Sequence, residues 1–209
     1  MLAYISSPAV PENKSALTPA GLSRTISSSA GGYDMEFIRT PEETSGQYLE
    51  VEVVMKPKGG NDMHYHTTFI EEFIVVEGIL GIQVEKELLH LIPGEKAVAP
   101  LYKLHRFFNP SETEPVRFRV LVKPARFFEA TLRIAHGLAN DGLCNKKGLP
   151  KSIWHLALLF EMGESYAPIL PHSLQTGLCS ILAGIARWLG KDKELEKYYK
   201  ATASTLARQ

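Results

Sequence analysis

Apolar and polar residues alternate in short runs along the middle of the chain. The segments 48–55 (YLEVEVVM) and 116–122 (VRFRVLV) each place every second apolar side chain on one face. A period of two is typical of a half-buried β-strand. Shorter strands are predicted at 35–39, 73–76, 79–84, 88–92, 96–99 and 104–108, with turns rich in Gly and Pro between them. About eight short strands at such spacing predict an all-β barrel or sandwich.

The pattern changes after Pro124, where helical spacing replaces alternation. Helices are predicted at 127–138, 152–162, 171–190 and 192–206. The third has an apolar stripe that we expect to pack on the barrel or on a second subunit, formed by Leu174, Leu178, Ile181, Leu182, Ile185 and Leu189. This helix is too short to span a bilayer, which needs about 20 apolar residues. A helix that lies in the membrane interface is the alternative.

Residues 1–32 are rich in Ser, Ala, Pro and Gly, which predicts an irregular arm that lies on the surface or exchanges with a partner subunit. The chain therefore divides into an arm (1–32), a β-barrel (33–124) and a helical extension (125–209). The fold class is mainly β.

Composition narrows the function classes. The 23 basic and 23 acidic residues give a net charge of zero, which argues against a nucleic-acid or anionic-membrane partner. Cys144 and Cys179 lie far apart with no CxxC spacing and are expected to be free thiols in a reducing compartment. The first 21 residues lack a basic segment and a long apolar run, so we expect a cytoplasmic protein without a secretory signal.

Candidate metal ligands lie between Gly60 and Gly78. His64 and His66 are two residues apart, so in a strand their imidazoles point to the same face. Metal–nitrogen bonds of about 2 Å allow two such side chains to share one ion. The alternative is that both are ordinary strand residues.

Two stretches of the chain resemble the paired motifs of the cupin superfamily. The first consists of Gly60, His64-Tyr65-His66, Glu71 and Gly78, and the second of Gly94, Pro100, His105 and Asn109. The resemblance covers roughly residues 35–124. It departs from the family pattern at Tyr102, where glycine is usual, and at Gly60, which stands one or two residues too close to His64.

The resemblance implies a single cupin barrel (a double-stranded β-helix or jelly roll) in which His64, His66, Glu71 and His105 converge on one metal. Alternation also favours Glu71 over Glu72, since Glu71 shares a face with Phe73. Three imidazoles and a carboxylate suit divalent Fe, Mn, Co, Ni, Cu or Zn. Four protein ligands leave a six-coordinate ion open to substrate, whereas they would close a tetrahedral zinc.

The first functional hypothesis is a metal-dependent oxygenase of the dioxygenase type that acts on a small organic molecule. No separate general base is evident, although Glu71 could serve if it leaves the metal. The alternatives are a non-catalytic module that binds a metal or small ligand, and a sugar isomerase or epimerase. Met55, Phe73, Tyr102 and Phe107 are candidate pocket walls. Cupins commonly dimerise, so a homodimer is expected.

Overall fold

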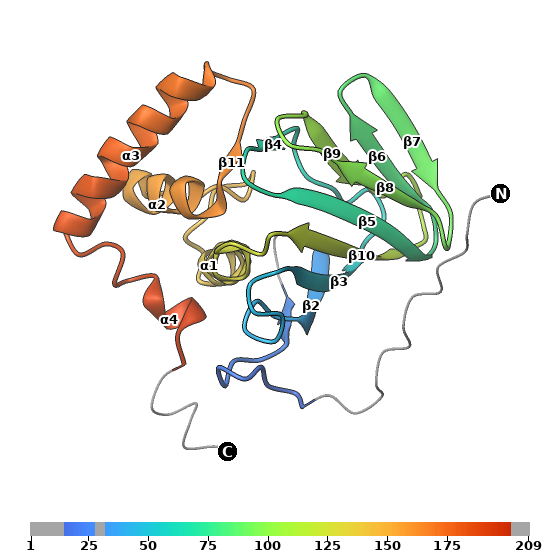
Figure 1. Ribbon diagram of the computed structural model, residues 1–209, viewed down its shortest axis with the longest axis horizontal. Coiled ribbons are helices and arrows are strands. Elements are labelled where there is room, and N and C mark those ends of the chain that lie inside the picture. The colour runs from blue at the N-terminus through green and yellow to red at the C-terminus, as the bar shows by residue number, and fades with distance from the viewer. Residues whose placement is uncertain (1–14, 28–31, 202–209) are drawn as a thin grey trace.

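Two antiparallel β-sheets face one another beside a group of helices (Figure 1). The computed structural model describes residues 15–27 and 32–201 of the 209-residue chain. The larger sheet has the order β1-β2-β3-β10-β5-β8, with strands Thr25–Ser27 (β1), Tyr33–Arg39 (β2), Leu49–Met55 (β3), Val116–Lys123 (β10), Ile70–Glu77 (β5) and Lys96–Ala99 (β8). The smaller has the order β7-β6-β9, with Glu87–Leu91 (β7), Leu80–Val84 (β6) and His105–Phe108 (β9). The predicted barrel strands are therefore present, with ends that differ by a few residues.

The barrel core lies between the two sheets. Alternate side chains of β3 and β10 point inward, as their period of two predicts, and meet Phe73 of β5. Leu80, Ile82 and Phe107 of the smaller sheet pack against them. At the turn between β5 and β6, Gly78 has a φ of 81°, and a Cβ there would lie 2.9 Å from the carbonyl oxygen of Pro115. This turn therefore requires glycine.

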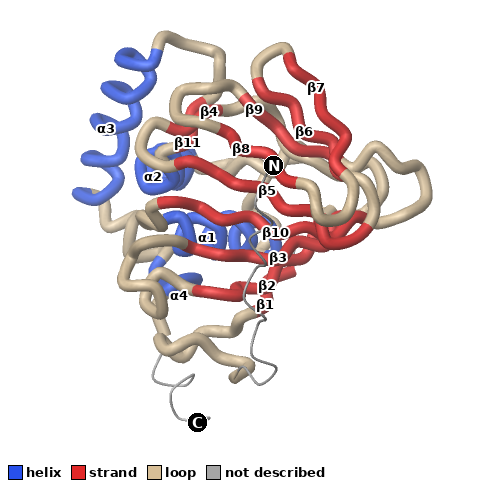
Figure 2. The backbone as a smooth tube through the Cα atoms, turned by 45° about the vertical axis from the view of Figure 1, so that its right-hand side comes forward, coloured by secondary structure: helices blue, strands red, loops and turns tan. Residues whose placement is uncertain are grey.

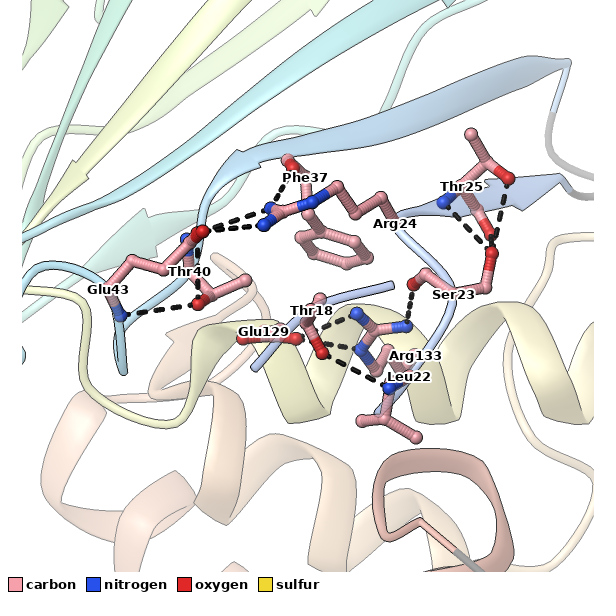
Figure 3. Close-up of polar contacts among 10 residues, drawn as sticks. All are labelled: Thr18, Leu22, Ser23, Arg24, Thr25, Phe37, Thr40, Glu43, Glu129 and Arg133. Atoms are coloured by element: carbon pink, nitrogen blue, oxygen red, sulfur yellow. Dashed lines mark hydrogen bonds and ion pairs between the residues drawn. The ribbon is translucent and has the colours of Figure 1, made fainter. Parts of the chain in front are cut away.

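The N-terminal segment differs from the irregular arm that composition predicts. Residues 15–27 are not simply an irregular arm, because β1 pairs with β2 and extends the larger sheet. The buried guanidinium of Arg24 donates hydrogen bonds to the Phe37 carbonyl (3.0 Å) and to Glu43 (2.5 Å), as Figure 3 shows. Arg133 donates to the Ser23 carbonyl at 2.8 Å. Buried ion pairs and backbone acceptors thus fix this segment, which composition alone does not reveal. Residues 1–14 and 28–31 lie outside the described residues.

The helices form a second core of their own beside the barrel (Figures 1 and 2). Phe128–Asn140 (α1) and Ile153–Gly163 (α2) match their predicted ranges closely. The Ser152 side chain accepts a hydrogen bond from the His155 N–H and so caps α2, as expected for serine at this position. Leu138, Leu158 and Leu195 are among the side chains that fill this core.

The last predicted helix is wrong in extent. Instead of a helix over 192–206, only Glu196–Tyr199 (α4) is helical, and residues 202–206 lie outside the described part of the chain. Leu195 is buried in the helical core, and Tyr198 lies over Gly137 of α1, where a Cβ would come within 2.1 Å of its ring. Tertiary contacts therefore set this segment's conformation, because a short polar helix is marginal on its own.

The helix His172–Trp188 (α3) is in the predicted place but faces differently. Its small and polar residues Gln175, Ala183 and Ala186 are buried, and α3 packs along α2 rather than on the barrel. Leu174, Ile181 and other members of the apolar stripe are exposed. Packing against the barrel is thus wrong for α3, since small side chains allow the closer approach to α2.

Within residues 15–27 and 32–201, no helix combines the length and apolar character needed to cross a bilayer. The division of the chain at residues 32 and 124 stays a prediction.

Candidate metal centre

His64 and His105 are brought together by a backbone bridge at the end of the barrel. The His64 N–H donates to the His105 carbonyl at 3.0 Å, and the His105 N–H donates to the His64 carbonyl at 2.8 Å. His66 follows in the two-residue strand Tyr65–His66 (β4), and Glu71 lies near the start of β5. Three strands and one bridge therefore position the four side chains.

The four predicted ligands form one cluster. One ligand atom from each of His64, His66, Glu71 and His105 lies within 4.8 Å of all the others. The Nε2 atom of His105 is 3.0 Å from Oε2 of Glu71, and Nε2 of His66 is 3.6 Å from the same oxygen. His64 is half-buried, whereas the other three are buried. The structure thus brings together all four residues.

Each histidine is oriented by a contact at its outer ring nitrogen. The Nδ1 atoms of His64 and His105 lie 2.9 Å from the carbonyl oxygens of Asp62 and Lys103, respectively. A carbonyl oxygen can only accept, so each Nδ1 must carry the hydrogen. The Nε2 atoms then face the centre of the cluster, which is the arrangement found around metal-binding histidines.

The third histidine is oriented from outside the barrel. Nδ1 of His66 is 3.2 Å from the Ser165 hydroxyl oxygen and 3.4 Å from the Glu164 carbonyl oxygen. Because the Ser165 hydroxyl donates to the Gly163 carbonyl at 3.0 Å, its oxygen accepts from His66. Ser165 belongs to the strand Ser165–Tyr166 (β11), which pairs with β4. The helical extension therefore supports a residue of the cluster.

Further contacts join this extension to the barrel. The Glu164 carboxylate accepts from Thr68 of the barrel at 2.7 Å. Within the extension it also accepts from Nε and Nη2 of Arg126 at 3.0 and 3.1 Å. Phe128 of α1 lies against His66 and Phe69, with ring-centroid distances of 5.8 and 4.9 Å. These contacts cover His66 from the helical side.

Burial and charge set the protonation of the cluster. Burial lowers the pKa of His64 to about 4, with His105 and His66 adding to the effect against the attraction of Glu71. Burial opposes ionisation of Glu71, but His66 and His105 outweigh it and hold the pKa well below its usual value. Burial likewise opposes protonation of His105, yet its hydrogen bond to Glu71 raises the pKa. The cluster thus holds a carboxylate and a neutral His64, as metal binding requires.

Tyr33 is a neighbour that the sequence analysis missed. It begins β2, and its ring lies 6.3 Å from that of Phe107 and 5.6 Å from that of His136. Burial raises the pKa of Tyr33, and the negative charge of Glu71 raises it further. The alternation of β2, with Met35 and Phe37 inward, was the available signal for placing this phenol inside the barrel.

The candidate pocket residues lie in two environments. Met55, Phe73 and Phe107 are buried in the barrel core. Tyr102 is 62% exposed and has a φ of 62°, the left-handed conformation that explains why glycine is usual at this family position. Its N–H donates to the His66 carbonyl at 2.7 Å, so the backbone of Tyr102 contacts β4. Their role as pocket walls stays a prediction.

Two cavities lie elsewhere. One of about 420 Å³ is lined by residues of β1, α1 and α4, including His136 and Tyr198. The other, of about 320 Å³, lies between α1 and the N-terminal segment and includes Phe127 and Tyr199. Neither cavity includes a residue of the four-member cluster.

The other glutamate, histidines and cysteines named here lie outside the cluster. Glu72 points out of the barrel and accepts hydrogen bonds from Lys123 and Lys96. His90 is exposed beside Phe108. His155 pairs with Glu194, and His172 contacts Tyr65. Both cysteines are free thiols, as expected.

An antiparallel barrel with this cluster between its sheets defines a β-barrel protein with a candidate metal centre. Residues 51–122 match the model of the family described as Cupin domain. These residues therefore form a cupin domain, and the predicted fold class is confirmed. No curated protein matches the sequence.

Several solved structures are similar to part of this chain. KdgF from Halomonas sp. is 20% identical, with 48% of this chain and 88% of that chain covered and a TM-score of 0.43. A sugar phosphate isomerase from a cupin superfamily of Silicibacter pomeroyi is 22% identical, with 46% and 62% covered and a TM-score of 0.40. A predicted oxalate decarboxylase from Thermotoga maritima is 14% identical, with 47% and 90% covered and a TM-score of 0.43.

The cluster fits a metal ion on its own chemistry. Nε2 of His66 is buried and has no hydrogen-bond partner among residues 15–27 and 32–201, a state that is costly for a polar atom unless another group satisfies it. It lies among two other imidazoles and a carboxylate, which are suitable ligands for a divalent transition metal.

Proposed function

We propose that the protein holds one divalent transition metal ion through Nε2 of His64, His66 and His105 and a carboxylate oxygen of Glu71. The observation that carries this proposal is the unpartnered, buried Nε2 of His66, which faces the Glu71 carboxylate at 3.6 Å. Fe, Mn, Co, Ni, Cu and Zn all suit this ligand set.

We further propose that the site belongs to a metal-dependent oxygenase of the dioxygenase type that acts on a small organic molecule. Four protein ligands leave free positions on a six-coordinate ion. When bound, the metal supplies Lewis-acid polarisation and a place to activate dioxygen. His64 is the half-buried member of the cluster, so its side offers an approach from solvent.

The chain's own residues hold and shield this site. The carbonyls of Asp62 and Lys103 and the Ser165 hydroxyl fix the three imidazoles. Phe69, with its ring centroid 4.0 Å from that of His66, excludes water from one side of that ligand. Fixed ligands lower the reorganisation that metal or substrate binding requires.

A non-catalytic binding module is the second candidate, and the packing of the barrel favours it. Phe73 and Phe107 fill the core together with Met55, and the two cavities described above lie away from the cluster. An enzyme for a small molecule ordinarily binds it in a pocket that adjoins the reactive centre.

Metal analysis tests the shared premise. Purified protein should contain close to one transition metal ion per chain or acquire it on reconstitution, and His105→Ala should not. His90→Ala, which removes an exposed histidine of the barrel, is the matched control and should retain the metal. A wild-type protein without affinity for Fe(II), Mn, Co, Ni, Cu or Zn would contradict the site.

Turnover is tested separately with the loaded protein. Oxygen consumption with a panel of small phenolics, diketones and thiols, lost in His105→Ala and kept in His90→Ala, would support the oxygenase. Metal binding without turnover on any substrate would favour the binding module. Conversion of a sugar without oxygen consumption would instead favour an isomerase or epimerase.

We also propose that the protein is cytoplasmic and works as a homodimer. The free thiols Cys144 and Cys179 are in keeping with a reducing compartment.

A further inference from the structure

Helix α3 lies at the outer edge of the molecule, where α2 is its main neighbour (Figures 1 and 2). Its inner face carries Gln175, Ala183 and Ala186, which are buried. The opposite face therefore has no partner among residues 15–27 and 32–201.

That outer face carries a regular row of large apolar side chains. Leu174, Leu178, Ile181, Ile185 and Trp188 are between 40% and 84% exposed. They are spaced alternately four and three residues apart, the a/d repeat of a coiled-coil seam. A sustained period of 3.5 residues matches the surface of another helix with the same repeat.

The face is also self-complementary. No Asp, Glu, Lys or Arg occurs between His172 and Ala186, so two copies can meet there without repulsion between side-chain charges. Beside the row, Gly177 and Gly184 have open space where a Cβ would stand. Small residues seven apart on the flank of such a row let a second helix come close.

Size and chemistry favour a second copy over other occupants. The helix has 17 residues and is about 25 Å long, and Ile169, Leu170 and Leu189 extend the exposed apolar surface at its ends. Monomeric proteins rarely expose contiguous apolar patches beyond a few hundred Å². A membrane surface is disfavoured, because interfacial helices carry Lys and Arg on their flanks and this one has none before Arg187.

We propose that α3 is a dimerisation helix, which packs its row of Leu174, Leu178, Ile181, Ile185 and Trp188 against the same row of a second copy of this chain. A two-fold axis makes both copies use the same surface. The proposal stands independently of any activity at the metal centre.

Sedimentation velocity of the full chain tests this arrangement over a dilution series. The wild type should be a dimer, and Ile181→Glu should weaken dimerisation by about a hundredfold or more, because it places like charges at the middle of the seam. Ser180→Glu is the matched control, since it adds the same charge to an exposed residue beside the row and should leave the dimer intact. Circular dichroism should show equal helix content in all three proteins.

Fluorescence gives a second readout in the unmodified chain. Trp188 is 84% exposed in the single chain and would be covered in the dimer. A soluble quencher should therefore reach it less at concentrations where the dimer forms and more on dilution. A monomeric wild type, or a dimer that survives Ile181→Glu, would overturn the proposal. So would a monomer that binds neutral or anionic lipid vesicles through α3, since the occupant would then be a membrane.

Discussion

Glu71 and Glu72 are neighbours in β5 whose carboxylates lie in opposite environments. Glu71 is buried between His66 and His105, whereas Glu72 accepts hydrogen bonds from Lys123 at 2.8 Å and Lys96 at 3.3 Å on the outer face. The hydrogen bond from Lys123, against burial, lowers the pKa of Glu72. Both side chains are anionic at neutral pH, so their positions alone distinguish their roles.

The same substitution at both positions separates these roles. Glu71→Gln removes the carboxylate of the cluster and should weaken binding of a divalent metal by about a hundredfold or more. Loss of a residue that only hydrogen-bonds to a metal ligand typically weakens metal affinity by about tenfold to a hundredfold. Glu72→Gln should leave affinity almost unchanged. Competition with a chromophoric chelator measures both. Equal losses would mean that net charge rather than ligation governs binding.

Glu43 gives a pH dependence of stability. Although burial opposes its ionisation, Arg24 and Thr40 together lower the pKa of Glu43 from 4.5 to about 2. A lowered pKa in the folded state means that the ionised group stabilises the fold above pH 4.5 and that this contribution is lost as the pH falls towards 2. Glu43→Gln should therefore lower the free energy of unfolding most at neutral pH and progressively less below pH 4.5.

Urea unfolding of the two proteins across this pH range measures the difference. Glu42→Gln is the matched control, because Glu42 is exposed and stands next to Glu43. A wild-type advantage that stays constant from neutral pH to pH 3 would contradict the role assigned to the Arg24–Glu43 pair.

At the scale of elements, the two-residue strand β11 acts on the metal centre through β4. Ser165→Ala removes the hydroxyl that accepts from Nδ1 of His66 but keeps the backbone pairing of β11 with β4. We expect metal affinity to fall by about tenfold, as is usual when an outer partner of a metal-binding histidine is lost. Metal titration measures this effect, with Ser173→Ala on the exposed start of α3 as control. Unchanged affinity would assign the orientation of His66 to the Glu164 carbonyl.

The sequence predicts elements well where a periodic pattern is long enough to read. β3 and β10 alternate over seven and eight residues, and the spacing of His64, His66, Glu71 and His105 carries the cluster. β11 contains two residues and contacts His66 across 99 positions of sequence, so no local pattern predicts it.

The sequence did not predict which face of α3 is exposed, for a related reason. Of the predicted stripe, Leu182 packs against the helical core while the other five residues are exposed, and the small residues Ala183 and Ala186 are buried instead. Hydrophobic periodicity identifies an apolar face without identifying the surface that covers it. The same limit applies to α4, whose ends are set by Leu195 and Tyr198.

At the scale of the whole molecule, two hydrophobic cores are held together by polar and aromatic contacts. The barrel core and the helical core are separate clusters. Phe128 contacts Phe69, Glu164 accepts a hydrogen bond from Thr68, and Arg133 donates to the Ser23 carbonyl. These contacts include buried groups that would be left unsatisfied if the helices came away alone, so we expect the cores to unfold together.

Leu158→Ala tests this coupling from inside the helical core. Leu158 is almost fully buried, so its truncation should lower the free energy of unfolding by about 2–5 kcal/mol, whereas Leu88→Ala on an exposed position should change it by about 0.5 kcal/mol or less. Trp154 and Trp188 report on the helices by fluorescence, and hydrogen exchange of β5 and β10 peptides reports on the barrel. If the cores are coupled, both probes shift by the same free energy in Leu158→Ala. A barrel that keeps wild-type protection while the tryptophan transition moves to lower denaturant would show that the helices unfold independently. The hydrogen bond between Ser165 and His66 would then break while the barrel stays folded.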